Sequence, residues 1–350
     1  MGRVQDPLKK VLVTGSGGRL ARVLLPMLLS HPAIGEVRGV DLRPSGLRHP
    51  KFREWRMDTR SPEIFTIAEG CHAVIHLAFV VMGGGLGLRR FSKRLVRAMD
   101  VEGSRSVFEA ASGADTLIFM SSAAVYGAYP DNPVPIREDH PLRPNPGFGY
   151  AWRKLLVERL LQDFARAHPK TRVVVMRPQA VLGPGAHPTL KAIARGPFCP
   201  MLPEPPPLVQ CVHERDVARA VVLALERPVS GAFNLAAHPP MSLCAMVRLS
   251  GGRAIPVPVP VLRGLQSLGW LFTPLAGEPG WAKGLYGSLV LSTERAENLL
   301  GWRGVDTVEC LVDSTAATKA VEFDKAFDEG KEDVTGQLDL GRARRPNKAP

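Results

Sequence analysis

The segment KVLVTGSGGRLARVLLPMLL, residues 10–29, sets the fold of this 350-residue chain. It opens on a short β-branched run, passes through a glycine-rich turn and continues into a stretch that is apolar on most faces. That is the order of a strand, a loop and a buried helix. A strand that leads directly into a helix in this way begins a βαβ unit, so the segment predicts an α/β protein.

The same alternation repeats along the first half of the chain. Five more strand-like runs are EVRGVD (36–41), FREWRM (52–57), HAVIHLA (72–78), TLIFMS (116–121) and RVVVMR (172–177). Helix-length segments at 61–69, 89–111 and 150–167 lie between most of them. Strands that alternate with helices build a parallel sheet covered on both faces, so we predict a Rossmann-type doubly wound domain over residues 8–177.

The alternation weakens after Arg177. Proline and glycine are frequent over 184–207, and the later elements are strand-like runs at 208–213 and 232–236 and a helix-length segment at 216–226. We predict a smaller substrate-binding region over 178–327, in which 208–236 contributes partly to the Rossmann core. The chain then turns polar and ends in a basic stretch without aromatic residues, so 328–350 is predicted to be a disordered basic tail.

The composition limits the class of protein. Hydrophobic residues make up 45% of the chain and charged residues 22%, which excludes wholesale disorder and a polytopic membrane protein. The net charge of +12 favours anionic ligands, but no recognition motif accompanies it, so nucleic acid is not an expected partner. The five cysteines form no C-x-x-C pair and no apolar signal core opens the chain. We therefore expect a reduced, cytoplasmic protein without a metal site.

The glycine-rich turn TGSGGRLA, residues 14–21, stands in the strand-to-helix context in which such turns bind a pyrophosphate. Gly15 permits the tight turn, and Gly17 or Gly18 lets backbone N–H groups approach phosphates at a helix N-terminus. Ala21 is small enough for the helix to pack close to the strand. A plain strand-to-helix turn is the alternative interpretation of this loop taken alone.

The acid at the end of the next predicted strand favours a dinucleotide. Asp41 follows Gly15 by 26 residues. A carboxylate there accepts hydrogen bonds from the adenosine ribose hydroxyls and repels a 2′-phosphate, which favours NAD over NADP. Arg43 is able to balance a 2′-phosphate, so NADP stays the alternative.

A phenol and an ammonium share one face of a predicted helix. Tyr150 and Lys154 stand four residues apart in GYAWRKLLVERLL (149–161). Lowering a phenol pKa from about 10 toward 7 takes roughly 4 kcal/mol, which a partly desolvated ammonium and a positive nicotinamide supply. SSAAVYG (121–127) ends a predicted strand at the sheet edge where ligands bind, so a serine there can hold a substrate oxygen while Tyr150 exchanges its proton. An exposed helix pair is the alternative for Tyr150 and Lys154 alone.

Together these motifs closely resemble the extended short-chain dehydrogenase/reductase family, also called the NAD-dependent epimerase/dehydratase family. The resemblance runs over most of residues 10–302. It rests on TGSGGRLA (14–21), VDLRP (40–44), Met57-Asp58, HLA (76–78), SSAAVYG (121–127), YAWRK (150–154), RPQAVLGPG (177–185), VHERDVARA (212–220) and LLGW (299–302).

The resemblance assigns roles to these residues. It implies that Ser122 is the catalytic serine, with Ser121 as the alternative. Tyr150 is then the proton donor or acceptor, and Lys154 is the ribose-binding cation. The implied cofactor contacts are Gly15, Gly17, Gly18, Arg19, Leu20, Asp41, Arg43, Asp58, Leu77, Ala78, Tyr150, Lys154 and Pro178.

Several positions depart from the family pattern. Ala123 and Ala124 stand where dehydratases of the family carry Asp-Glu, so dehydration is disfavoured. The region 281–302 has Lys283 but no basic-then-acidic stretch of the kind that clamps a nucleotide-sugar diphosphate. That departure gives weight to a hydroxysteroid-like or other lipid or aldehyde substrate beside a sugar nucleotide. Asp100 stands where the family commonly has Asn, and Arg153 where Ser or Thr precedes the lysine.

The resemblance leads to a predicted function. We expect an NAD-dependent oxidoreductase or epimerase that transfers hydride at a secondary alcohol or ketone carbon. The alternative is a catalytically silent NAD(P)-binding regulatory or scaffolding protein, because a fold alone does not establish chemistry.

Two further segments, one basic and one apolar, indicate which partners the protein could contact. Arg89, Arg90, Lys93, Arg94 and Arg97 give the predicted helix at 89–111 a dense basic face. The resemblance places that helix and the Tyr150 helix at a homodimer contact. The apolar run at 256–274 is too short and too proline-flanked to span a bilayer, and it predicts a packed helix. Peripheral contact with a membrane is the less favoured alternative.

Overall fold

The fold is taken from a computed structural model. It describes residues 9–81, 85–86, 89–186, 198–201, 205–250, 255–272 and 287–315. The predicted basic tail at 328–350 and Lys283 lie outside the described residues.

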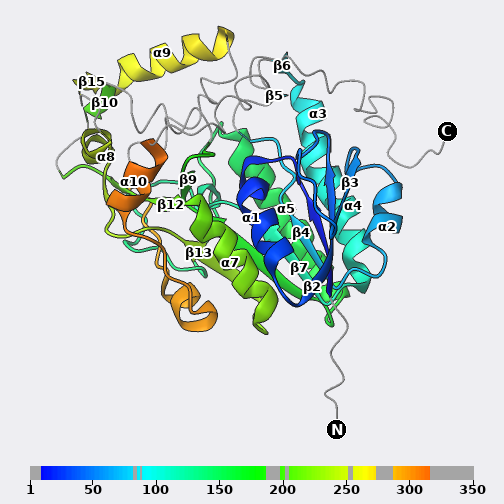
Figure 1. The fold of residues 1–350 in the computed structure, drawn as a ribbon. Coiled ribbons are helices and arrows are strands. Elements are labelled where there is room, and N and C mark those ends of the chain that lie inside the picture. Colours follow the sequence, from blue (N-terminus) through cyan, green and yellow to red (C-terminus); the bar gives the residue numbers. More distant parts are fainter. Residues whose placement is uncertain are drawn as a thin grey trace.

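A seven-stranded sheet forms the centre of the molecule (Figure 1), with the strand order β13-β8-β7-β4-β1-β2-β3 and every pairing parallel. The strands are β1 (Lys9–Thr14), β2 (Ile34–Asp41), β3 (Phe52–Arg56), β4 (Ala73–His76), β7 (Thr116–Met120), β8 (Arg172–Pro178) and β13 (Gly231–Leu235). This confirms the predicted Rossmann-type sheet. The strand order reverses between β1 and β4, and open parallel sheets bind ligands at the carboxyl ends beside such a point.

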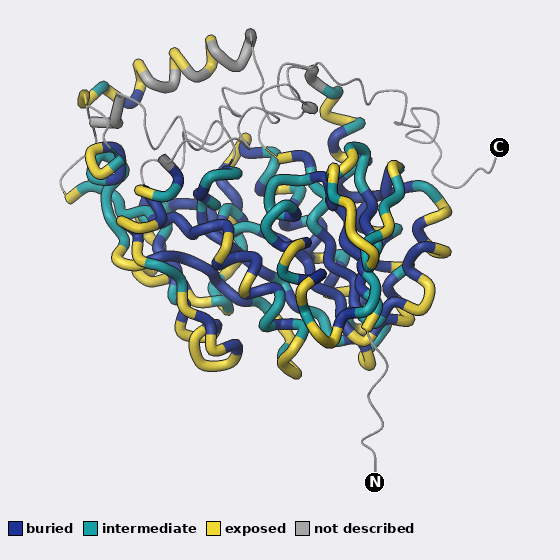
Figure 2. The backbone as a smooth tube through the Cα atoms, in the orientation of Figure 1, coloured by how far each residue is buried: buried dark blue, intermediate teal, exposed yellow. Residues whose placement is uncertain are grey.

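Helices cover both faces of this sheet. On β1, Val11 and Val13 face a core built with α1 (Arg19–Ser30) and α7 (Glu214–Glu226), whereas Leu12 faces the opposite core. The opposite core is covered by α2 (Glu63–Ala68), α4 (Gly103–Ala110) and α5 (Gly149–Ala167). Apolar residues on both sides of one strand explain why the strands read as continuous hydrophobic runs. Figure 2 shows the same arrangement, with buried central strands and exposed outer helix faces.

The segment predicted as one helix over 89–111 is divided. Arg89–Arg90 form β6, which pairs antiparallel with β5 (Gly85–Leu86). The helix begins as α3 (Lys93–Arg97), because the Ser92 side chain accepts a hydrogen bond from the Leu95 amide and caps it. The helix continues through the short π-helix η1 (Ala98–Glu102) into α4. Arg89 and Arg90 are therefore not part of a helical basic face, which corrects the prediction.

Shorter elements follow the sheet. They are η2 (Ala111–Gly113), η3 (Ala123–Val125), β9 (Ala180–Leu182), β10 (Phe198–Met201), β11 (Leu208–Val209), β12 (Cys211–His213), β14 (Met241–Ser242), α8 (Leu243–Leu249), β15 (Ile255–Pro258), α9 (Val259–Phe272), η6 (Ala296–Leu300) and α10 (Thr307–Thr315). A separate small core includes Leu182, Met246 and Leu311. The residues 208–236 thus include a main-sheet strand, β13, and the covering helix α7, while the division of the chain into domains stays a prediction.

The packing of α9 and the state of the cysteines differ from the predictions. On α9, Val261, Leu265 and Leu268 are at least half exposed, so this face is not packed as predicted. Among the described cysteines, Cys244 is disulfide-bonded, which departs from the reduced set expected from the sequence. None of the helices in the part of the chain that the structure describes combines the length and the apolar content needed to cross a membrane.

Candidate active site

The glycine-rich loop after β1 packs tightly against the turn after β4 and the residues after β2. Gly15 has a φ of +78°, and a Cβ there would lie 2.6 Å from the Ala78 amide nitrogen. A Cβ on Gly17 would lie 2.4 Å from the Arg43 carbonyl oxygen. Gly18 caps α1 without a side-chain hydrogen bond, and the first turn of α1, which starts at Arg19 and Leu20, has no acidic residue. The amides at this helix N-terminus therefore suit a pyrophosphate, and the residues present fit a dinucleotide.

Two carboxylates lie beside this loop. Asp41 Oδ2 accepts from the Gly17 amide at 3.1 Å, and Oδ1 accepts from the Arg43 amide at 2.9 Å. Burial raises the pKa of Asp41, and the neighbouring Arg43 opposes that rise. The second carboxylate, Glu54, accepts from the Ser16 hydroxyl at 2.9 Å. Because both acids flank the site expected for the ribose, the local charge favours NAD over NADP.

The other predicted cofactor residues also lie at the carboxyl ends of strands. Asp58 follows β3 and is held by Arg60, whose Nη2 lies 2.6 Å from Asp58 Oδ2. Leu77 and Ala78 follow β4, and their backbone lies against Gly15. Pro178 ends β8. These residues all lie at the carboxyl edge of the sheet. Their roles in cofactor binding stay predictions.

Lys154 lies buried on α5, with 2% of its surface exposed. Its ammonium donates to the Met120 carbonyl at 2.5 Å and lies 3.6 Å from the centre of the Phe79 ring. Burial lowers the pKa of Lys154 to about 7, while Asp100 and Glu158 raise it. A cation held by a carbonyl and an aromatic ring inside the protein suits a group that stabilises a transient negative charge.

Tyr150 and Ser122 meet beside this lysine. The two hydroxyls are joined by a hydrogen bond, which lowers the pKa of Tyr150 against the dominant effect of burial, and burial raises that pKa to about 12. The Tyr150 ring centre lies 5.8 Å from Lys154 Nζ. Ser122 is half-buried in extended backbone after β7 and caps η3. The structure thus brings together the serine, the phenol and the ammonium predicted from the sequence.

Ser121, the alternative serine, belongs to a buried polar network. Its hydroxyl donates to Glu158 Oε1, and Glu158 Oε2 lies 2.7 Å from Arg177 Nη2. Arg177 Nη1 donates at 2.7 Å to the hydroxyl of Tyr126, which donates to Asn234 Oδ1 at 2.8 Å. Because the Ser121 hydroxyl is committed to this network and only 2% of Ser121 is exposed, the geometry favours Ser122 as the substrate-facing serine.

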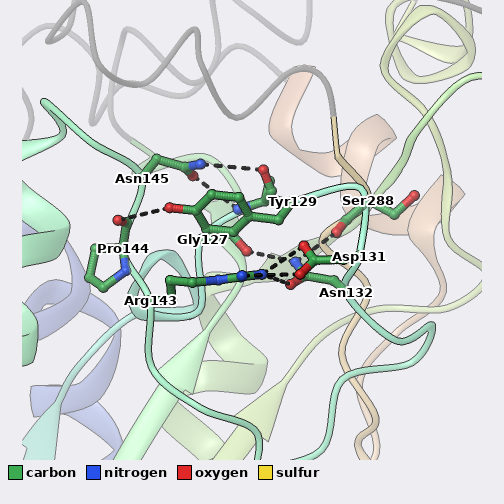
Figure 3. Close-up of polar contacts among 9 residues, drawn as sticks. Gly127, Tyr129, Asp131, Asn132, Arg143, Pro144, Asn145 and Ser288 are labelled. Carbon is green, nitrogen blue, oxygen red and sulfur yellow. Dashed lines mark hydrogen bonds and ion pairs between the residues drawn. The ribbon is translucent and has the colours of Figure 1, made fainter.

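Hydrogen bonds and an ion pair order the loop between β7 and α5. The Asn145 side chain accepts from the Ala128 amide and donates to the Ala128 carbonyl. Asn132 donates to the Gly127 carbonyl at 2.8 Å (Figure 3). Arg143 pairs with Asp131 at 2.7 Å and covers the ring of Tyr129, whose hydroxyl donates to the Pro144 carbonyl. Asn132 also donates to the Ser288 carbonyl, and this contact ties the loop to the later part of the chain. These contacts hold the residues just before Tyr150.

The buried network gives a stability prediction. Glu158→Ala leaves the Arg177 guanidinium, whose side chain is 7% exposed, without its carboxylate. We expect a loss of about 3–5 kcal/mol of unfolding free energy, measured by denaturant titration. The matched control is Glu294→Ala, which breaks an exposed pair with Arg137 and is expected to cost below about 1 kcal/mol. Equal losses in the two variants would show that the network does not stabilise the edge of the sheet.

A family model and two groups of relatives match this chain. The model of the NAD dependent epimerase/dehydratase family matches residues 11–236. An uncharacterized protein of Mycobacterium tuberculosis is 29% identical over 261 residues, which cover 72% of this chain and 68% of that protein. UDP-glucose 4-epimerase 2 of Oryza sativa subsp. japonica is 32% identical over 158 residues, 43% of this chain and 32% of the epimerase.

Solved structures share the fold. MoeE5 in complex with UDP-glucose and NAD has a TM-score of 0.66 and 24% identity, over 87% of this chain and 97% of MoeE5. A short-chain dehydrogenase/reductase superfamily protein from Agrobacterium tumefaciens with bound NAD also has a TM-score of 0.66 and 24% identity, over 92% of this chain and all of that one.

Proposed function

This chain belongs to the NAD dependent epimerase/dehydratase family, and from that premise we propose that it transfers hydride between NAD and a secondary alcohol or ketone carbon. The observation that carries the proposal is the hydrogen bond between Ser122 and Tyr150 beside the buried ammonium of Lys154. This group lies at the carboxyl edge of the sheet, next to a glycine loop shaped for a pyrophosphate. Bound NAD supplies the hydride acceptor or donor.

The residues divide the proton chemistry among them. A substrate hydroxyl placed between Ser122 and Tyr150 would give its proton to the phenolate form of Tyr150 as hydride leaves the carbon for the nicotinamide. Ser122 orients the substrate oxygen. Lys154 stabilises the phenolate and binds ribose hydroxyls. The hydrogen bond from Ser122 and the charge of Arg153 oppose the burial that raises the pKa of Tyr150.

The substrate proposed first is a sugar nucleotide. UDP-glucose 4-epimerase 2 of Oryza sativa and the UDP-glucose complex of MoeE5 support that class. In an epimerase the keto intermediate stays bound and is reduced from its other face, whereas in a dehydrogenase it leaves. Dehydration stays disfavoured, because Ala123 and Ala124 in η3 supply neither an acid nor a base.

A lipid-like hydroxyl or ketone substrate is the second candidate, and α9 is the observation that favours it. Val261, Leu265 and Leu268 lie at helical spacing on this helix and are 50–55% exposed. In Figure 1, α9 and the β5–β6 hairpin lie on the same side of the sheet, at the top of the view. An exposed apolar stripe on that side suits an apolar substrate or its carrier.

Two experiments separate these candidates. Mass spectrometry of ligands released from the purified protein reports the nucleotide and the substrate class. Turnover on a panel of UDP-sugars and hydroxysteroids then decides between the two substrate candidates. NADH binding without turnover on any member supports the silent regulatory alternative instead.

Cofactor choice gives a further expected result. We expect NADH to bind at least about 10-fold more tightly than NADPH, because Asp41 and Glu54 repel a 2′-phosphate. Asp41→Asn removes one of these charges, so the preference should narrow, as measured by fluorescence titration of both reduced cofactors. An unchanged ratio in Asp41→Asn would mean that another group selects the cofactor.

The homodimer stays a proposal supported by one exposed side chain. Trp152 on α5 is 43% exposed, and α5 is one of the helices that the family resemblance places at a dimer contact. Sedimentation of the wild type and of Trp152→Glu tests it. A dimer that the charge disrupts supports this face as the contact, and a monomeric wild type rejects the dimer.

A further inference from the structure

A buried carboxylate joins three elements next to the candidate catalytic group. Asp100 lies in the π-helix η1 and is 1% exposed. Its Oδ1 accepts from the Val80 amide at 2.8 Å, in the turn after β4. Its Oδ2 accepts from Arg153 Nε on α5 at 2.7 Å. One side chain therefore ties the turn after β4 to the helix that carries Tyr150 and Lys154.

The turn held in this way is the one on which the lysine and the tyrosine rest. Phe79 directly precedes Val80, and its ring lies 3.6 Å from Lys154 Nζ. The same ring meets the Tyr150 ring edge-on, with 5.7 Å between the ring centres. A displacement of the turn at Val80 would therefore shift the aromatic surface that both side chains contact.

The charges of Asp100 and Arg153 compensate one another. Burial raises the pKa of Asp100 to about 6, and Arg153 opposes that rise by ion pairing and a hydrogen bond. The Asp100 carboxylate in turn favours the charged form of Lys154, while Arg153 disfavours it. Removing one partner leaves the other charge buried with less compensation, and breaking a buried pair in this way costs more than removing both members.

We propose that Asp100 and Arg153 form a positioning unit that holds the Phe79–Val80 turn against α5 and thereby places Lys154 and Tyr150 for cofactor and substrate. The unit rests on the proposed function, since its purpose is the placement of these two groups. Asp100 and Arg153 act through Val80 and Phe79 and through their charge on Lys154.

A double-mutant cycle tests this unit. The variants are Asp100→Asn, Arg153→Ser and the double variant, and the readout is NADH affinity by fluorescence titration. We expect each single variant to weaken NADH binding about 10-fold and the double variant to bind no more weakly than Asp100→Asn, because the two residues act as one. Glu36→Gln is the control, since it breaks the partly buried Glu36–Arg38 pair at the start of β2 and should leave NADH affinity unchanged.

A pH profile separates positioning from a merely structural effect. The charged and titratable groups around Asp100 and Lys154 are Arg153, Tyr150 and Glu158 on α5 and His76 on β4. The Asp100 carboxylate raises the pKa of Lys154, so Asp100→Asn should lower that pKa. The loss of NADH affinity with rising pH should then begin at a lower pH than in the wild type. A purely structural defect weakens binding equally at every pH.

The possible results separate the positioning unit from the proposed function. Wild-type affinity and an unchanged pH profile in both single variants, alongside weakened binding in Lys154→Met, overturn the positioning unit. So do single effects that multiply in the double variant. If Asp100→Asn does not fold, Arg153→Lys retains the cation and should bind NADH better than Arg153→Ser. If Arg153→Ser does not fold, Arg153→Lys should bind NADH better than Asp100→Asn. A wild type that binds no NADH defeats the proposed function and the unit with it, whereas binding without turnover defeats only the proposed chemistry.

Discussion

Replacing Tyr150 with phenylalanine is expected to lower kcat about 10³-fold while NADH affinity changes less than about 3-fold. The phenylalanine ring retains the edge contact with Phe79, at 5.7 Å between centres, but it has no hydroxyl to exchange a proton with the substrate. General acid–base groups contribute about 10²–10⁴-fold to turnover, which sets the size of the expected loss.

The measurement for Tyr150→Phe is steady-state turnover on the best member of the UDP-sugar and hydroxysteroid panel, with NADH titration in parallel. A matching control is Ser122→Ala, which removes the hydroxyl that pairs with Tyr150 but leaves the base in place. That variant should lose less activity than Tyr150→Phe. Turnover in Tyr150→Phe that equals wild type would remove Tyr150 from the proton transfer.

The second large effect is expected at the glycine-rich loop. Gly15→Ala places a Cβ 2.6 Å from the Ala78 amide nitrogen and forces alanine to a φ of +78°. Backbone atoms must move, so NADH affinity should fall at least about 100-fold, together with a lower melting temperature.

Gly70→Ala separates the clash from the backbone strain. Gly70 also has a positive φ, +68°, but a Cβ at this position would have no neighbouring atom within 4 Å. The substitution should lower stability by about 1 kcal/mol and leave NADH affinity unchanged. Equal NADH affinities in the two variants would show that closure of the Gly15 turn against Ala78 is not needed for the cofactor.

Local patterns were sufficient for the sheet and for the candidate catalytic group. Most strands of the main sheet are short apolar runs with a helix-length segment after them, and the strands begin and end within a few residues of the predicted limits. Tyr150 and Lys154 are one helical turn apart, so the sequence predicts that they are neighbours. The local pattern predicts a serine at the end of a strand, whereas the choice of Ser122 comes from the family resemblance.

Contacts between distant residues were not visible in the sequence. The choice between Ser121 and Ser122 depends on Glu158, which lies 37 residues after Ser121 and whose contact with it no local pattern indicates. Asp100 and Arg153 were each marked as departures from the family pattern, but their pairing spans 53 residues. The helix start at Lys93 depends on the cap at Ser92, a signal that the basic run concealed.

The central claim is that Ser122, Tyr150 and Lys154 act on a substrate carbon beside NAD, and the absorbance of reduced nicotinamide tests it most directly. NAD-loaded wild type is mixed rapidly with each UDP-sugar and hydroxysteroid alcohol of the panel, and Tyr150→Phe is treated in the same way. We expect reduced nicotinamide to form in the wild type with at least one substrate and not in Tyr150→Phe. A wild-type signal that stays flat with every substrate, or one that is identical in Tyr150→Phe, would contradict the account.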